Sequence, residues 1–291
     1  MIIDRLYDEV KKKGNVCIGL DTSLEYIPPQ ILNRYDSIED VIFEFNRRII
    51  DATIDIVPCY KVQIAFYEAH GIKGLIAYKR TLKYLREKKS LIIADIKRGD
   101  ISSTAKMYAK AHFEGDFESD LITLNPYMGF DSITPYLDYV KNNKKGLFVL
   151  LRTSNEGAKD IQYLETKNGE RIYNYVGDKL NELALKYTGN SGYSSIGVVV
   201  GGTHLEEAKE IRKRFENLFF LIPGYGAQGG KGEDVAQYLK SGNGGVVNSS
   251  RGILTAYRKH EDGAEKFDEY ARMAALSMKE DIQSGTEIWQ R

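Results

Sequence analysis

The segment Leu91-Ile92-Ile93-Ala94-Asp95-Ile96-Lys97-Arg98-Gly99-Asp100 is the most informative stretch of this 291-residue sequence. Its apolar start runs into charged residues and then Gly99, which is typical of a buried strand that stops at a polar edge. Residues two apart point to the same side of a strand, so Asp95 and Lys97 are expected to face one way. Such charges are costly to bury unpaired and useful where charge develops in a reaction. By itself, the segment fits a structural ion pair as well as an active site.

Strand-like apolar segments alternate with amphipathic helical patterns along the whole chain. Besides Leu91–Lys97, the predicted strands are Val16–Asp21, Val57–Gln63, Leu121–Pro126, Gly146–Thr153, Ile196–Gly201, Leu218–Gly224 and Gly245–Ser249. An N-terminal helix is predicted, followed by helices at Ile38–Ile54, Ala65–Lys88, Ser102–Phe113, Ser132–Asn142, Tyr173–Tyr187, Leu205–Phe215, Asp234–Lys240 and Ala264–Gln283. These repeats predict an α/β fold with a single (β/α)8 TIM barrel domain over residues 1–291. A doubly wound open sheet is the alternative.

Composition narrows the functional classes. Lys plus Arg and Asp plus Glu both number 41, so the sequence has no electrostatic footprint for nucleic acid or an anionic membrane. Cys17 and Cys59 both lie in apolar segments, which favours reduced core thiols and a cytoplasmic protein. No apolar run is long enough to cross a bilayer, and the charged N-terminus lacks the apolar stretch of a signal peptide.

Polar residues fall at the ends of most predicted strands. They are Asp21, Lys61, Asp95, Lys97, Asn125, the run Arg152-Thr153-Ser154 and Arg251. In a barrel the carboxyl ends of the strands surround one mouth, where active sites are built. The pattern therefore favours an enzyme. The four histidines are dispersed and show no metal-ligand spacing, so no metal site is expected.

A glycine-rich loop, Pro223-Gly224-Tyr225-Gly226-Ala227-Gln228-Gly229-Gly230-Lys231-Gly232, follows the seventh predicted strand. Its spacing formally matches a dinucleotide fingerprint, but it follows the wrong strand and no acid lies about twenty residues further on. A single phosphate site fits better, because glycines let backbone N–H groups approach an anion. The planar guanidinium of Arg251, in the eighth loop, suits the same phosphate. A flexible surface loop is the alternative interpretation.

Together these motifs resemble the orotidine 5′-phosphate decarboxylase family. The resemblance rests on Asp95-x-Lys97-x-x-Asp100-Ile101, the loop Pro223–Gly230, Asp21, Lys61 and Ser249–Gly252, which occur in the expected order. Asn125–Gly129 and Arg152–Asn155 look like the longer bacterial subgroup of that family. The resemblance implies a carboxy-lyase that converts orotidine 5′-phosphate to UMP and CO2 in pyrimidine biosynthesis. It also implies that the reaction needs no cofactor and no metal.

The resemblance also implies roles for individual residues. Lys61, Asp95, Lys97 and Asp100 would form the catalytic array, in which Lys97 stabilises and protonates the C6 carbanion. Asp100, Ile101 and Thr104 would reach into the site of a second subunit, which implies a homodimer. Substrate would be bound by Asp21, Lys61 and Thr104 at the ribose, by Ser154 at the pyrimidine, and by Pro223, Gln228, Gly230, Ser250 and Arg251 around the phosphate.

The chemistry agrees with these residue types, since a carbanion in the ring plane cannot be delocalised and needs a nearby cation. Two alternatives stay open. One is a metal-dependent decarboxylase of the same superfamily that acts on a 3-keto sugar-acid phosphate, and the other is a non-catalytic barrel that binds a phosphate ligand. The segment Asn155–Arg171 is longer than in compact family members and is either a lid element or decoration.

Overall fold

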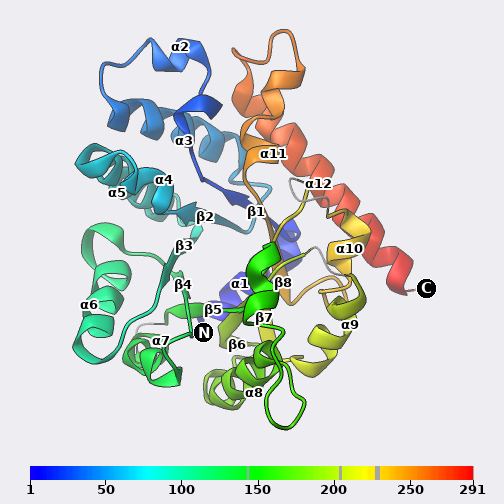
Figure 1. Ribbon diagram of the computed structural model, residues 1–291. Coiled ribbons are helices and arrows are strands. Elements are labelled where there is room, and N and C mark those ends of the chain that lie inside the picture. The colour runs from blue at the N-terminus through cyan, green and yellow to red at the C-terminus, as the bar shows by residue number, and fades with distance from the viewer. Residues whose placement is uncertain (143, 203–204, 227–229, 291) are drawn as a thin grey trace.

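Eight parallel strands close into a barrel that is surrounded by helices (Figure 1). The computed structural model describes residues 1–142, 144–202, 205–226 and 230–290. The strands are β1 (Val16–Gly19), β2 (Cys59–Gln63), β3 (Leu91–Arg98), β4 (Leu121–Leu124), β5 (Gly146–Arg152), β6 (Ser194–Val200), β7 (Leu218–Pro223) and β8 (Gly245–Ser249). Each strand pairs with the next, and β8 pairs with β1. The predicted barrel is confirmed and the open doubly wound sheet was wrong, because the sheet closes on itself.

The helices follow the predicted pattern with two instructive differences. They are α1 (Ile2–Lys13), α2 (Pro29–Leu32), α3 (Ile38–Thr53), α4 (Ala65–Glu68), α5 (Gly71–Glu87), α6 (Ser102–Phe113), α7 (Leu137–Asn142), α8 (Ile172–Ala184), α9 (Leu205–Arg214), α10 (Gly232–Ala236), α11 (Arg251–Leu254) and α12 (Phe267–Gln290). The predicted helix Ala65–Lys88 is two helices, since Gly71, the first residue of α5, adopts a φ of 60°. The predicted helix Ser132–Asn142 starts with 3-10 turns around Pro135, which lacks the N–H that an α-helix interior needs.

Helix α1 closes the amino end of the barrel. Its buried residues Ile3 and Leu6 pack in one apolar cluster with Cys17, Cys59 and Phe148 from the strands. The two cysteines are in register on neighbouring strands, are buried and remain free thiols, as predicted. Within the described part of the chain, no helix has the length and apolarity to cross a membrane. With this end filled, the open carboxyl end is left to hold a site.

Candidate active site

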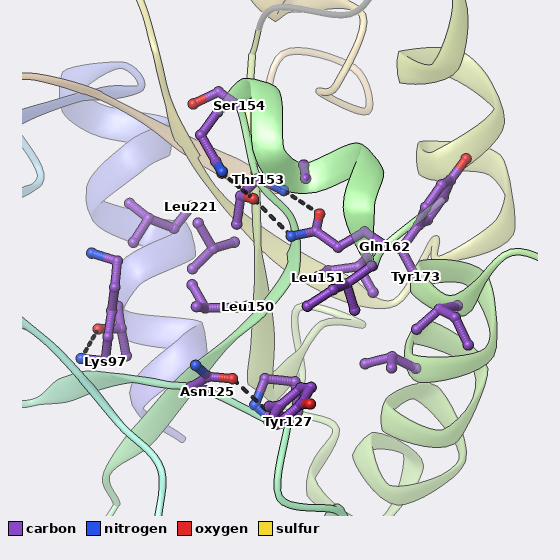
Figure 2. Close-up of a pocket in the computed structure, with 18 of the residues that line it drawn as sticks. Lys97, Asn125, Tyr127, Leu150, Leu151, Thr153, Ser154, Gln162, Tyr173 and Leu221 are labelled. Atoms are coloured by element: carbon purple, nitrogen blue, oxygen red, sulfur yellow. Dashed lines mark hydrogen bonds between the residues drawn. The ribbon is translucent and has the colours of Figure 1, made fainter. Parts of the chain in front are cut away.

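A cavity of about 1010 Å³ opens at the carboxyl end of the barrel. Its charged wall consists of Lys61 from β2 with Asp95 and Lys97 from β3. The opposite wall contains Ser154 after β5 and apolar residues of the following segment and α8. Figure 2 shows Lys97 on one side of this space and Thr153, Ser154 and Gln162 on another. The prediction that the charged strand ends meet at one mouth is therefore confirmed for these strands.

Asp95 is the centre of a connected array of charges. Its Oδ1 accepts a hydrogen bond from Lys97 Nζ at 2.7 Å, and its Oδ2 lies 3.1 Å from Lys61 Nζ and 3.0 Å from Gln63 Nε2. Lys61 Nζ also donates to Asp21 Oδ1 at 2.8 Å. The Lys61 side chain is only 4% exposed, whereas that of Lys97 is 44% exposed. The array thus presents one accessible ammonium to the cavity and buries the other.

The array keeps Asp95 and Lys61 charged. Burial alone would raise the pKa of Asp95, but the ammonium groups of Lys61 and Lys97 outweigh burial and lower that pKa to about 2. Burial alone would lower the pKa of Lys61, but the carboxylates of Asp21 and Asp95 raise it instead. Near neutral pH, Asp95 is therefore an anion held between two cations.

A bulge in β3 sets the direction of Lys97, and Thr123 of β4 holds that bulge. The register between β3 and β4 shifts between Ala94 and Arg98, and Lys97 has a φ of 44°, in the left-handed region. Thr123 Oγ1 accepts hydrogen bonds from the backbone N–H groups of Ile96 and Lys97, at 3.0 and 2.9 Å, and donates to Asp95 Oδ1 at 2.8 Å. The simple alternation expected for β3 is broken here, although Lys97 still reaches Asp95.

The array continues across β1 to the end of β8. Ser250 Oγ donates to Asp21 Oδ2 at 2.8 Å and accepts from Asn248 Nδ2 at 3.4 Å. The approach needs a glycine at position 19, because a Cβ on Gly19 would lie 1.9 Å from Ser250 Oγ. Hydrogen bonds and ion pairs therefore link the ends of β8, β1, β2 and β3. The sequence predicted Ser250 only as a residue near the phosphate, and this role of its hydroxyl was missed.

Sequence reasoning also missed Gln63 and Thr123 as partners of Asp95. Gln63 could have been found, because it lies two residues after Lys61 on the same predicted strand and so shares its side. Thr123 gave a weaker signal, as a single hydroxyl in an apolar strand. Its importance comes from the bulge in β3 opposite it, which no sequence pattern in β3 predicts.

The predicted phosphate residues lie on neighbouring loops. β7 and β8 pair with Pro223 opposite Asn248, so the loops after them are adjacent. Pro223 lines the cavity, and Gly230 is buried and accepts a hydrogen bond from the Gly226 N–H at 3.0 Å. Arg251 is exposed at the start of α11. The remaining predicted residue, Gln228, lies outside the described residues.

Asp100, Ile101 and Thr104 are not joined to the array within this chain. The carboxylate Oδ1 of Asp100 accepts a hydrogen bond from the Ile101 N–H at 2.8 Å. Ile101 is 41% exposed, and Thr104 is exposed on α6. Three of the four predicted catalytic residues therefore meet in one chain, and the fourth stands apart beside an exposed apolar side chain.

Arg152 corrects the expectation for β5, because it does not face the mouth. The register of β5 against β6 shifts between Leu150 and Arg152. Arg152 is fully buried, its Nη2 donates to Tyr238 Oη at 2.8 Å, and its Nε lies 3.5 Å from Glu207 Oε2 of α9. The bulge turns this guanidinium toward the surrounding helices, while Ser154 lines the cavity.

The fold and the site define the class of protein: a (β/α)8 barrel enzyme with a lysine–carboxylate array at its carboxyl end and a glycine-rich sequence after β7. Among the described residues, no three His, Cys, Asp or Glu side chains are grouped so that they could hold a metal ion. The chain belongs to the orotidine 5′-phosphate decarboxylase / HUMPS family, whose model matches residues 14–267. The family predicted from the motifs is thereby confirmed.

Individual relatives match this chain over nearly its full length. The chain is 66% identical over 285 residues to the orotidine 5′-phosphate decarboxylase of Petrotoga mobilis, covering 98% of this chain and 99% of the relative. It is 64% identical to the orotidine 5′-phosphate decarboxylase of Clostridium acetobutylicum, covering 97% and 99%. Among solved structures, the OMP decarboxylase of Leishmania donovani superposes with a TM-score of 0.78 at 28% identity, covering 98% of this chain and 99% of that one.

Proposed function

We propose that this chain converts orotidine 5′-phosphate to UMP and CO2 in pyrimidine biosynthesis. The observation that carries the proposal is the Asp95 carboxylate between two ammonium groups, one of them open to the cavity. The names of the relatives at 66% and 64% identity support the same activity. Neither the sugar-acid phosphate decarboxylase nor the non-catalytic barrel is favoured by these relatives.

Lys97 is the catalytic residue of this mechanism. The bond between C6 of the pyrimidine and its carboxylate breaks, CO2 leaves, and the electron pair stays on C6 in the ring plane. The Lys97 ammonium stabilises that charge and then transfers a proton to C6, which gives UMP. Asp95 orients the ammonium through its hydrogen bond, and its pKa of about 2 keeps it an anion while the reaction proceeds.

The remaining predicted residues bind the substrate around this centre. Asp21 and Lys61 contact the ribose hydroxyls from the buried side of the array, and Ser154 hydrogen-bonds the pyrimidine amide from the opposite wall. The phosphate is held by Arg251 and Gln228, with backbone N–H groups near Gly230 and Ser250, in the loop that starts at Pro223. Binding energy at the phosphate, far from C6, then helps to order the site for the chemical step.

We propose a homodimer in which each site is completed by Asp100, Ile101 and Thr104 of the other subunit. Support comes from the separation of Asp100 from the array and from the exposed apolar residues around it. Ile101, Met107, Tyr127 and Met128 are 41%, 61%, 78% and 50% exposed. Ile101 and Met107 belong to the start and body of α6, and Tyr127 and Met128 lie in the turn after β4, whose end bonds to Arg98 of β3. Exposed apolar side chains in neighbouring segments are typical of a protein contact.

Mixing two inactive variants tests the shared site. Lys97→Ala and Asp100→Ala proteins, mixed so that subunits exchange, should recover roughly a quarter of wild-type turnover, because each hybrid dimer has one intact site. Lys97→Ala mixed with Lys61→Met is the control, since no hybrid of these two has an intact site. Recovery in neither mixture, with exchange verified, would exclude the shared site.

The reaction is proposed to proceed in the cytoplasm without cofactor or metal. The free thiols of Cys17 and Cys59, in register on adjacent strands, support a reducing compartment. The decisive assay follows the loss of ultraviolet absorbance of orotidine 5′-phosphate in the presence of EDTA. Full turnover supports the proposal. Turnover that requires added magnesium favours the metal-dependent alternative, and UMP binding without turnover favours the non-catalytic barrel.

A further inference from the structure

The segment after β5, residues 155–171, is attached firmly to the barrel; we name it the β5 lobe. It contains a 3-10 helix at Glu156–Asp160 and an antiparallel bridge between Glu165 and Arg171. Its outer end is tied to α9, where Glu207 Oε1 lies 2.9 Å from Arg171 Nη1 and Glu207 Oε2 accepts from Tyr163 Oη at 2.6 Å. These two polar contacts to one carboxylate attach the outer end of the β5 lobe to α9.

The inner end of the β5 lobe is tied to the end of β5 by one side chain, Gln162. Its Oε1 accepts a hydrogen bond from the Thr153 N–H at 2.9 Å, and its Nε2 donates to Thr153 Oγ1 at 2.8 Å. Thr153 Oγ1 in turn donates to Asn155 Oδ1 at 2.6 Å. Figure 2 shows Gln162 extending from the lobe to Thr153 with both bonds drawn. One amide group therefore fixes both the backbone and the side chain of Thr153.

The end of β6 contacts the same turn, which contains Thr153 and Ser154, from the other side. The N–H of Gly201 donates to the Arg152 carbonyl at 2.8 Å. A Cβ on Gly201 would lie 2.7 Å from Ser154 Cβ, so the two backbones are in close contact. Ser154 follows the clamped residue Thr153 directly, and both line the cavity. The direction of Ser154 is thus determined by Gly201 on one side and Gln162 on the other.

We propose that Gln162 is a positioning residue that holds Ser154 against the pyrimidine amide. This inference rests on the proposed function for the role of Ser154. It explains why the chain carries a longer segment here, since the segment supplies the amide that orients the turn. The phosphate loop lies after other strands, so the clamp acts on the base and not on the phosphate.

The test measures binding of UMP and of inorganic phosphate by calorimetry, together with turnover of orotidine 5′-phosphate. Gln162→Met, which keeps the length but loses both hydrogen bonds, should weaken UMP binding and raise KM about tenfold, as expected for a lost pair of hydrogen bonds. Inorganic phosphate should bind as in the wild type. Gln162→Glu, which retains an acceptor for the Thr153 N–H, should recover most of the UMP affinity. Gln30→Met, at an exposed position on helix α2, is the matched control and should change the binding of neither ligand.

A double-mutant comparison separates positioning from general damage. In a Ser154→Ala background, Gln162→Met should weaken UMP binding by less than about twofold, because the contact that it positions is already gone. Equal effects in both backgrounds, equal weakening of phosphate and UMP, or unchanged UMP binding in Gln162→Met would each overturn the inference. The UMP measurement does not need turnover, so it decides the clamp even if wild-type protein fails to decarboxylate the substrate.

Discussion

Strands β3 and β5 each carry a cation at a register shift near the carboxyl end, yet the two cations have opposite surroundings. Lys97 of β3 is 44% exposed to the cavity and is paired with Asp95 at 2.7 Å. Arg152 of β5 is fully buried between the barrel and its helices, and its nearest carboxylate oxygen, on Glu207, lies 3.5 Å away. Two buried nitrogens of Arg152, Nε and Nη1, have no hydrogen-bond partner among the described residues. A charge at a strand end therefore serves the site only when the local backbone turns it inward.

The cause of the difference lies in the neighbouring strand. Thr123 of β4 binds two consecutive N–H groups of β3 and Asp95 together, which aims Lys97 back at the carboxylate. At β5, alternation from Phe148 and Leu150, which face the barrel interior, would place Arg152 inside as well. The register shift between Leu150 and Arg152 instead turns the Arg152 side chain away from the barrel interior.

The largest expected effect is at Lys97. Lys97→Ala should lower turnover by at least roughly a thousandfold, because it removes both the electrostatic stabilisation of the carbanion and the proton donor. Binding of UMP should survive, since UMP lacks the carboxylate that leaves. Steady-state kinetics and calorimetry on the same preparation check both parts. Turnover close to that of the wild type would contradict the assignment of Lys97.

Lys61→Met should have the next largest effect. The change removes the buried ammonium that pairs with the carboxylates of Asp21 and Asp95. Leaving these carboxylates with one fewer cation should lower the unfolding free energy by about 3 kcal/mol. Turnover should fall roughly a hundredfold, as for loss of one preorganised charge at a reacting centre. Denaturant unfolding near neutral pH and kinetics at saturating substrate measure the two losses. A stable variant with unchanged turnover would show that the buried half of the array is dispensable.

Asp95 should make the unfolding free energy depend on pH in the acid range. Its pKa is lowered in the folded protein from 3.8 to about 2, so its contribution is present above about pH 4 and is lost as the pH falls through 2. Between pH 5 and pH 2, wild-type protein should lose about 2 kcal/mol more unfolding free energy than Asp95→Asn. Denaturant titrations of both proteins at these two pH values give the difference. Parallel losses would mean that the carboxylate is not stabilised by Lys61 and Lys97.

The smallest effect is expected at Arg152. Arg152→Met replaces a buried cation by an apolar side chain, while Glu207 keeps its contacts with Arg171 and Tyr163. Unfolding free energy should stay within about 1 kcal/mol of the wild type, because a buried ion contributes little net stability when its partner remains satisfied. Turnover should stay within about twofold. A tenfold loss of turnover with an intact fold would place Arg152 in the active site after all.

Local sequence patterns were sufficient to predict the secondary-structure elements and the family, because such patterns depend on residues that are neighbours in the chain. β8 has the predicted bounds, and β3 and α6 differ from prediction by at most one residue, since apolar runs and helical spacing are read within a few positions. The predicted helix Ala65–Lys88 was wrong at Gly71 because a residue with positive φ leaves no mark in apolar periodicity. The bulges in β3 and β5 were not predicted for the same reason, and Arg152 was misplaced with them.

The sequence by itself determined the order of eight strands and helices, the charges in or near the carboxyl ends of β1, β2 and β3, and membership of the decarboxylase family. Only the tertiary structure decided which of those charges meet. The ion pairs of Asp95, the Ser250 bond to Asp21 and the clamp of Gln162 on Thr153 join different elements of the fold. Whether such groups touch depends on strand register and bulges, which are set by the packing of the whole barrel and not by any one segment.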